Sequence, residues 1–482
     1  MLSSRWAAPL LVASLAACGG GAGGGTTQNT GNAGNPAPAP GVAAAFTLQD
    51  VEVTPYALWD DAAATQAITV KAHTRISGRV SLQLAYFDGL VDGSGAQIVE
   101  PMFDDGTHGD QAAGDGVWTR TFTLTISSPG RLRLYDGLVD SVPIAIAAVN
   151  DDHAPVPASN AIDARVDVAI VSRTMQGAFP ARAVGAAAQA TDTMLNIVDP
   201  AFAEADIQRI VARVLELLPG DPLDFVVLFH TRTTSDGVPR SIGVKNDVDG
   251  INVPAFDHSA AYGSAGRLQQ VVFQNAHTLG VEINHEIGHR WGAYLNRNEL
   301  NLTLPTGFHW GASNHVGVMG NGPYLLQEPG GLRVTNAEDS EKFVANPFSN
   351  LELYLMGLAQ PDEVAPLRFV TDASVDVRFD ALLSASATRT VTIDDIVAVY
   401  GTRTPISSHS QNAFNAAYVV VSDLPLSEAE YTLTSLIARY AAGTSPGGKR
   451  DGGLFEALDP PSFGAATGYR ATLDTTLPSL AG

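Results

Sequence analysis

Residues 285–292 read His-Glu-Ile-Gly-His-Arg-Trp-Gly, and this stretch is the most informative part of the chain. Apolar residues surround it at near-helical spacing, at Val281, Ile283, Ile287 and Tyr294. This pattern predicts a helix, on which His285 and His289 lie one turn apart on the same face. Two imidazoles in that arrangement can bind one metal ion, and Glu286 lies beside them, within reach of a water molecule at that ion. We therefore expect a metal site here, with Zn²⁺ as the metal.

The HEIGHRWG stretch resembles the HExxH motif of the zincin metallopeptidases, and more closely an exported bacterial lipoprotein group that carries an N-terminal β-sandwich module. The likeness extends over most of residues 158–400, through His309-Trp310, HVGVMGNG at 315–322 and NLELYLMGL at 350–358. The resemblance implies that His285 and His289 are zinc ligands and that Glu286 is the general base. It also implies a zinc metalloendopeptidase that hydrolyses peptide bonds in extracytoplasmic proteins or peptides.

The third metal ligand does not lie in the HExxH stretch, because the compact metzincin pattern fails in this chain. Gly292 stands where that pattern has a glycine, but Leu295 stands where it has the third ligand, and leucine cannot coordinate a metal. The third ligand must therefore come from farther along the chain. We favour His309, since the nearby histidines and Met319 resemble one compact site with a methionine floor. The alternatives are Glu352, which would resemble the glutamate ligand of gluzincins, and His315.

The catalytic domain should also contain a group that stabilises the oxyanion and a strand that can pair with substrate. An electrophilic group that stabilises the oxyanion is expected, and Tyr324, His315 and Tyr354 are the candidates. The sequence does not distinguish among them. Residues 268–273 predict a strand just before the HExxH stretch, which could pair with an extended peptide substrate.

Residues 46–150 predict an all-β module. Short runs of alternating apolar residues bounded by turns, without a clear helix, favour an Ig-like antiparallel sandwich. Between two of these strands lies a turn-forming stretch rich in aspartate and glycine, with Asp104, Asp105, Asp110 and Asp115. Aspartate and glycine at this density are typical of tight turns. The same carboxylates could instead bind Ca²⁺, which prefers oxygen ligands.

The predicted secondary structure changes in residues 158–482, where strands and helices alternate. Buried strands are predicted at 166–171 and 224–229, with an amphipathic helix at 204–218 between them. This alternation indicates an α/β or α+β unit. The whole chain is thus predicted to be multidomain, with the β-sandwich module followed by a zincin-like catalytic domain.

The first 45 residues predict an export signal and a membrane anchor rather than a folded unit. Residues 1–17 combine one positive charge with an apolar stretch that is too short to span a bilayer, as in a signal peptide. Leu15-Ala16-Ala17-Cys18 resembles the lipobox of bacterial lipoproteins, which implies a lipidated Cys18 and a membrane-anchored protein of the cell envelope. Residues 18–45 are rich in glycine and proline and predict a flexible tether.

Composition limits the remaining functions. Because Cys18 is the only cysteine, the chain can form no internal disulfide and no multi-cysteine metal site. The net charge of −22 and the scattered lysines argue against nucleic acid as a partner. We expect a monomer whose partners are a protein or peptide substrate and, through the lipid, a membrane. The rival interpretations are a non-catalytic binding or adhesion lipoprotein with a structural zinc site, and a zinc hydrolase of non-peptide amides.

Overall fold

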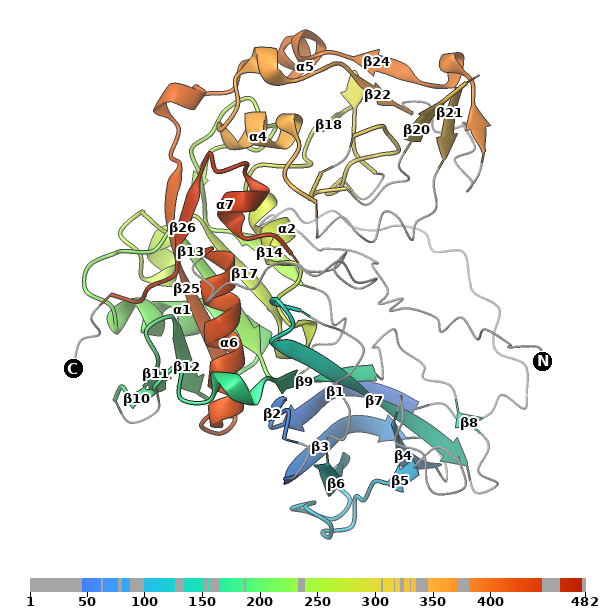
Figure 1. Ribbon diagram of the computed structural model, residues 1–482, viewed down its shortest axis with the longest axis vertical. Helices are drawn as coiled ribbons and strands as arrows, with labels where there is room; N and C mark the ends of the chain where they lie inside the picture. Colours follow the sequence, from blue (N-terminus) through green and yellow to red (C-terminus); the bar gives the residue numbers. More distant parts are fainter. Residues whose placement is uncertain are drawn as a thin grey trace, which may run out of the picture.

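The computed structural model describes residues 46–478, except for 62–63, 77–79, 87–98, 126–133, 151–154, 157–164, 186–187, 233–238, 305–306, 316, 321–324, 330, 335–345, 371–380 and 444–459. The predicted signal peptide, the tether with Cys18, and Tyr324 lie outside these residues. The described part of the chain is rich in β-structure and contains several sheets (Figure 1). This agrees with a multidomain, β-rich protein, whereas the Ig-like and zincin-like assignments remain predictions.

The N-terminal strands form two sheets, at the bottom of Figure 1. One has the order β1-β3-β6, and the other β2-β9-β7-β4-β5 with β8 beside β7. Alternation explains the strands: Ile68, Val70 and Ala72 are buried at every second position of β3. The strands are β1 (Phe46–Thr54), β2 (Ala57–Trp59), β3 (Thr65–Ile76), β4 (Val80–Tyr86), β5 (Val99–Pro101), β6 (Val117–Thr125), β7 (Val139–Asn150), β8 (Pro155–Val156) and β9 (Arg165–Val171).

Strand β9 lies in a different sheet from the one that the sequence suggested. The sequence predicts that the strand at 166–171 belongs to the C-terminal unit, residues 158–482. Instead, β9 pairs antiparallel with β7 and parallel with β2, so it completes a sheet of the N-terminal module. A buried apolar run shows that a strand is present, but not which strands it pairs with.

The C-terminal unit is built on an eight-stranded sheet of order β10-β11-β12-β25-β13-β17-β14, with β26 beside β25. Its central strands β12, β25, β13 and β17 are mutually parallel, and β14 pairs antiparallel with β17. The strands are β10 (Arg182–Ala183), β11 (Ala188–Ala190), β12 (Met194–Val198), β13 (Phe225–His230), β14 (Arg240–Gly243), β17 (Gln270–Asn275), β25 (Ala413–Ser422) and β26 (Thr472–Asp474).

Both faces of this sheet are buried, each in its own apolar cluster. Val226 and Leu228 of β13 pack on the side of α1 (Ile207–Glu216), whose Ile210 and Val214 belong to the same cluster. Val227 belongs to the cluster on the other face, which is covered by α2 (Ile283–Gly288) and α6 (Glu428–Ala441). The continuously apolar central strands are therefore the expected result of a parallel sheet with helices on both sides.

The N-terminal module and the C-terminal unit share one apolar cluster and are joined by buried hydrogen bonds. The backbone N–H of Tyr56 donates to Glu430 Oε1 over 2.9 Å, and the Tyr56 hydroxyl donates to the Glu430 carbonyl over 3.2 Å. Elsewhere the Tyr135 hydroxyl donates to the backbone carbonyl of Leu279, four residues before α2. The module therefore supports the turn that leads into the HExxH helix.

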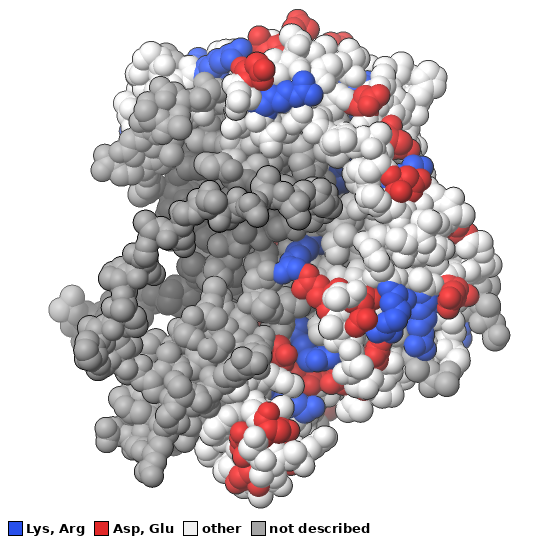
Figure 2. Space-filling view, turned by 180° about the vertical axis from the view of Figure 1, so that it is seen from behind, with Lys and Arg blue, Asp and Glu red and all other residues white. Residues whose placement is uncertain are grey.

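The part of the chain between α2 and β25 forms smaller elements, at the top of Figure 1. They are β18 (Asn296–Arg297), β19 (Leu300–Asn301), β20 (Leu325–Glu328), β21 (Gly331–Val334), β22 (Leu367–Phe369), β23 (Leu382–Leu383), β24 (Arg389–Val391), α4 (Asn350–Met356) and α5 (Ile393–Tyr400). Two short strands, β15 (Lys245–Asn246) and β16 (Phe256–Asp257), precede α2, and α7 (Phe463–Ala466) follows α6. None of the described helices is long and apolar enough to cross a membrane. On the face drawn in Figure 2, basic and acidic side chains are interspersed, without a broad basic area.

Two buried histidines at the carboxyl ends of the central strands carry strongly lowered pKa values. Burial, with Arg232 and His277 adding to it, lowers the pKa of His230 to about 3, and its ring packs against Phe202 at 4.7 Å between centroids. Burial also lowers the pKa of His277 to about 4, although the backbone carbonyl of Asp167 opposes this shift. Both side chains are therefore neutral in the folded protein at any pH above about 4.

This predicts an acid-sensitive fold. Below the unfolded pKa of about 6.5, each such histidine takes up a proton only on unfolding, so stability falls as the pH falls towards 4. The free energy of unfolding should lose about 1.4 kcal/mol per pH unit for each of them. Chemical denaturation of the full chain between pH 7 and pH 5 measures this slope. His230→Gln should reduce it by about one proton, and an unchanged slope would contradict the assignment.

Candidate metal centre

The HExxH helix α2 is placed by the strand before it and by its own apolar face. After β17 the chain reverses through Leu279 and Gly280, both with positive φ, and returns along the sheet as α2. Ile283 and Ile287, four residues apart, are buried in the core beneath the helix. Gln270 Nε2 on β17 donates to the Glu286 carbonyl over 2.6 Å and ties the helix to the sheet.

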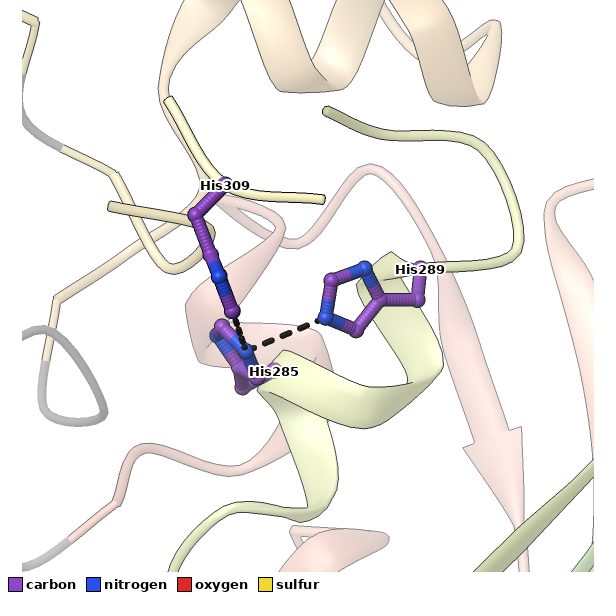
Figure 3. Close-up of side chains that lie close together, drawn as sticks. All are labelled: His285, His289 and His309. Carbon is purple, nitrogen blue, oxygen red and sulfur yellow. Dashed lines mark hydrogen bonds between the residues drawn. The ribbon is translucent and has the colours of Figure 1, made fainter. Parts of the chain in front are cut away.

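Three imidazoles converge at this helix (Figure 3). His285 lies on α2, His289 caps the end of the helix, and His309 comes from the loop after the β18–β19 hairpin. His285 Nε2 lies 3.1 Å from His309 Nε2 and 3.2 Å from His289 Nε2. All three side chains are buried, with exposed fractions of 2% for His285, 4% for His289 and 5% for His309.

The imidazoles are held in the neutral form that a metal needs. Burial lowers the pKa of His285 to about 4 against the opposing effect of the Val318 carbonyl, and burial with nearby His285 lowers that of His309 to about 3. Burial and both neighbouring histidines hold the pKa of His289 well below 6.5. The Nδ1 of His285 lies 2.7 Å from the Val318 carbonyl, which fixes Nδ1 as the donor and leaves the Nε2 lone pair facing the other rings.

The two Nε2 separations from His285, to His289 and to His309, fit a tetrahedral metal site. Ligand nitrogens at 2.0–2.1 Å from a tetrahedral centre lie about 3.3 Å from one another, close to the separations seen here. Neutral imidazole nitrogens this close, buried and facing one another, are best satisfied by a shared cation. The group can therefore hold a metal ion, and Glu286, which is completely buried, follows His285 directly on the same helical turn.

Glu352 organises the loops around the three histidines. Its Oε1 accepts from Trp310 Nε1 at 3.0 Å and from the backbone N–H of Met319 at 2.8 Å. Its Oε2 accepts from the backbone N–H of Val318 at 3.2 Å and of Ser349 at 2.7 Å. Glu352 thereby fixes Trp310, the neighbour of His309, and Val318, whose carbonyl orients His285.

The ionised form of Glu352 suits this role. Burial acts to raise the pKa of its carboxyl, but the interactions with His315 and with the backbone N–H groups of Ser349 and Met319 outweigh burial and lower it. The space around the carboxylate is also fully used, because a Cβ on Gly317 would lie 2.1 Å from Glu352 Oε2. Glu352 is the alternative metal ligand that the sequence suggests, but in the structure both of its oxygens accept hydrogen bonds from these donors.

Glu352→Gln should therefore destabilise the protein strongly. The amide nitrogen of glutamine would face two N–H groups that now donate to a carboxylate oxygen, at a cost of about 3 kcal/mol. Chemical denaturation of the full chain, followed by fluorescence, measures the change. Glu363→Gln is the matched control, since that carboxylate pairs with Arg470 at the protein surface, where water screens the pair, and its replacement should have a much smaller effect. Equal effects of the two substitutions would contradict the role assigned to Glu352.

Met319 packs directly against α2 and the turn after it, at two glycines. A Cβ on Gly288 would lie 2.3 Å from Met319 Sδ, and a Cβ on Gly292 would lie 3.3 Å from Met319 Cγ. The two glycines of the HEIGHRWG stretch are thus the positions that let methionine approach the helix. Leu295, where a third ligand would stand in the compact pattern, is fully buried in the apolar core.

Two of the three candidates for stabilising the oxyanion, His315 and Tyr354, lie among the described residues, and their contacts differ. His315 Nε2 lies 3.0 Å from Ser349 Oγ and 3.6 Å from Glu352 Oε1, so it belongs to the Glu352 network. The Tyr354 hydroxyl accepts from the backbone N–H of Arg403 at 3.3 Å, on the side of α4 that faces that arginine. Neither His315 nor Tyr354 belongs to the three-histidine group, and Tyr324 lies outside the described residues.

Two groups that shape the site, Gln270 and the Val318 carbonyl, are not predicted from the sequence. The role that the sequence suggests for β17 is wrong. The parts played by Gln270 and by the Val318 carbonyl depend on long-range contacts that leave no local pattern. Strand β17 has neighbours on both edges, β13 and β14, so it cannot pair with a peptide as we had expected. The outermost described strand on this side of the sheet is β14.

The aspartate-rich turn of the N-terminal module brings three carboxylates together. Ligand oxygens of Asp104, Asp110 and Asp115 lie within 4.8 Å of one another. Each is also used locally: for example, Asp104 Oδ1 accepts from the backbone N–H of Gly114 at 2.8 Å, and Asp110 Oδ2 accepts from that of Gly106. Asp105 instead accepts from the backbone N–H of Thr107. The hydrogen bonds show the expected turn chemistry, and calcium binding stays a prediction.

Comparison with known proteins adds no assignment to this geometry. No protein-family model matches the chain, and no curated protein matches it either.

Proposed function

We propose that this protein is a zinc-dependent hydrolase that cleaves peptide bonds, with His285, His289 and His309 as the zinc ligands. The observation that carries the proposal is the convergence of three buried, neutral imidazoles beside Glu286 on one helical turn. Zn²⁺ in such a site supplies a Lewis acid that polarises the scissile carbonyl and activates water. A set of three histidine ligands is typical of catalytic zinc sites, which keep the fourth position for water or substrate.

The residues of the chain have distinct tasks in this proposal. Glu286 takes a proton from the attacking water and delivers it to the leaving amine. The Val318 carbonyl keeps His285 in the required tautomer, and Glu352 holds the loop that carries Val318 and Trp310. Met319 supports the helix from below through Gly288 and Gly292.

Strand β14 supports a polypeptide as the substrate. Gln270 Nε2 donates to Ser241 Oγ on β14 and to the Glu286 carbonyl, so the outer strand is linked directly to the helix that carries the site. Among the described residues β14 pairs only with β17. A peptide that added itself to the other edge of β14 would lie extended beside α2. The lipobox-like stretch before Cys18 supports a location in the cell envelope, where exported proteins or peptides are the available substrates.

Cleavage of a broad peptide library by the zinc-loaded full chain tests the proposal. We expect cuts that disappear when a chelator removes the metal and return when zinc is restored. Small non-peptide amides should be turned over far more slowly than peptides. A library left intact by fully zinc-loaded protein would contradict the proposal and favour a binding protein with a structural zinc site.

A further inference from the structure

A second site lies at the opposite ends of the strands from the turn that leads into α2. A cavity of about 560 Å³ opens at the amino ends of β13, β17 and β25, where Asp224, Gln269 and Phe414 lie. Because these three strands are parallel, their amino ends meet at one edge of the sheet. None of the three histidines of the candidate metal centre lines this cavity. Its volume is in the range of small-molecule sites.

The charged side chains that line the cavity are predominantly cationic. Lys245, Arg267, Arg290 and Arg403 contribute four positive charges, whereas Asp224 and Asp247 contribute two negative ones. This excess is unusual in a chain whose net charge is −22. Cationic groups that gather around a cavity in an acidic protein attract anions from solution.

The two carboxylates are already shared among several donors. Asp247 accepts from Arg290 Nη2 at 3.3 Å and lies 3.6 Å from Lys245 Nζ, and its own side chain is 63% exposed. Asp224 accepts from Arg267 Nη2 at 3.1 Å and from the backbone N–H of Asn415 at 2.8 Å. Of the described cations, Asp224 thus pairs with Arg267 alone, whereas Asp247 faces both Lys245 and Arg290, so the four cations of the lining exceed its two carboxylates by two charges.

Arg403 contributes a buried charge whose described hydrogen bonds all go to uncharged acceptors. Its guanidinium donates to the carbonyls of Leu355, Met356 and Pro405 and to Ser410 Oγ. The first two carbonyls belong to the last turn of α4, where the helix dipole favours a cation. This arrangement holds the guanidinium rigidly at the cavity wall without cancelling its charge.

Part of the wall is aromatic and apolar. Trp291 and Phe414 meet edge to face, with ring centroids 5.7 Å apart, and Met356 lies beside them in the lining. The Arg290 guanidinium lies 5.5 Å from the centroid of the Trp291 ring. An apolar surface next to a cationic rim suits a ligand that carries both an apolar body and an anionic group.

We infer that this cavity is a binding site for a small amphipathic anion, a carboxylate or phosphate ester, whose oxyanion meets the partly exposed Lys245 and Arg267 and whose apolar body lies against the wall that Trp291 and Phe414 form. The site does not depend on the proposed peptidase activity. Arg290 and Trp291 directly follow His289, so a bound anion contacts the segment that leaves the metal centre.

Calorimetric titration of the full chain with benzoate, phenyl phosphate and neutral benzamide tests this inference. Both anions should bind and benzamide should not, and binding should weaken as salt is added. The tighter of the two anions identifies the preferred oxyanion. Binding of benzamide as tight as that of benzoate, or no binding of either anion, would overturn the inference.

Variants place the binding in this cavity. The double variant Lys245→Gln, Arg267→Gln should weaken anion binding at least tenfold. The fold should tolerate the change because both side chains are partly exposed, by 27% for Lys245 and 43% for Arg267. Arg209→Gln, on the exposed side of α1, is the control and should leave the affinity unchanged. Zinc content is measured in parallel and should stay constant, which separates this site from the metal centre. Equal anion affinity in the double variant and the wild type would refute the assignment.

Discussion

Glu286→Gln is expected to retain bound zinc and to lose peptide hydrolysis by about 10²- to 10⁴-fold, the usual contribution of a general base. The side chain is fully buried on α2 between His285 and His289 in the sequence, so glutamine preserves its size and removes only its basicity. The measurement is kcat/KM on a peptide that the wild type cleaves, together with zinc content by elemental analysis.

The matched control for this substitution is Glu299→Gln. Glu299 is an exposed glutamate between β18 and β19, on the segment that leads from α2 to His309, and its replacement should leave both zinc content and kcat/KM unchanged. Full activity in a zinc-loaded Glu286→Gln variant would remove Glu286 from the mechanism. Loss of zinc together with activity would instead show that Glu286 supports the metal centre.

His309→Ala is expected to weaken zinc binding at least about 100-fold, since even the partners of metal ligands contribute 10- to 100-fold. His285 and His289 remain, but the described residues of the loop offer no other histidine in the group. Competition with a chelator of known affinity measures the change at a fixed pH, because protons compete for the same imidazoles.

Two further histidine variants make this result specific. His258→Ala removes an exposed histidine and should have no effect on zinc affinity. His315→Gln tests the alternative ligand directly: it should keep one zinc per chain, since His315 Nε2 lies against Ser349 and Glu352. Retention of tight zinc in His309→Ala with its loss in His315→Gln would contradict the proposed ligand set.

The sequence predicted the local parts of the site well, for a physical reason. His285, Glu286 and His289 lie within one helical turn, so their mutual geometry follows from the helix period alone. The same holds for many strands, such as β4, β6 and β13, whose apolar patterns are visible in the sequence. These features depend on neighbours a few residues away.

Features that depend on long-range contacts were harder to predict. His309 and Glu352 could both reach the helix in principle, and only the folded loops show that His309 joins the group while Glu352 holds Trp310 and Met319. The partners of β9 and the interior position of β17 follow from sheet order, which no local pattern encodes. The cavity beside Arg290 likewise combines residues from distant segments of the chain.

The central claim is that His285, His289 and His309 together bind one zinc ion. An anomalous difference map recorded at the zinc absorption edge, from crystals of the full chain, tests this claim most directly because it identifies the metal and its ligands together. We predict a single strong peak about 2.0–2.1 Å from the Nε2 atoms of all three histidines. A map without a peak between these rings, or with a peak bound by Glu352 in place of His309, would contradict the account.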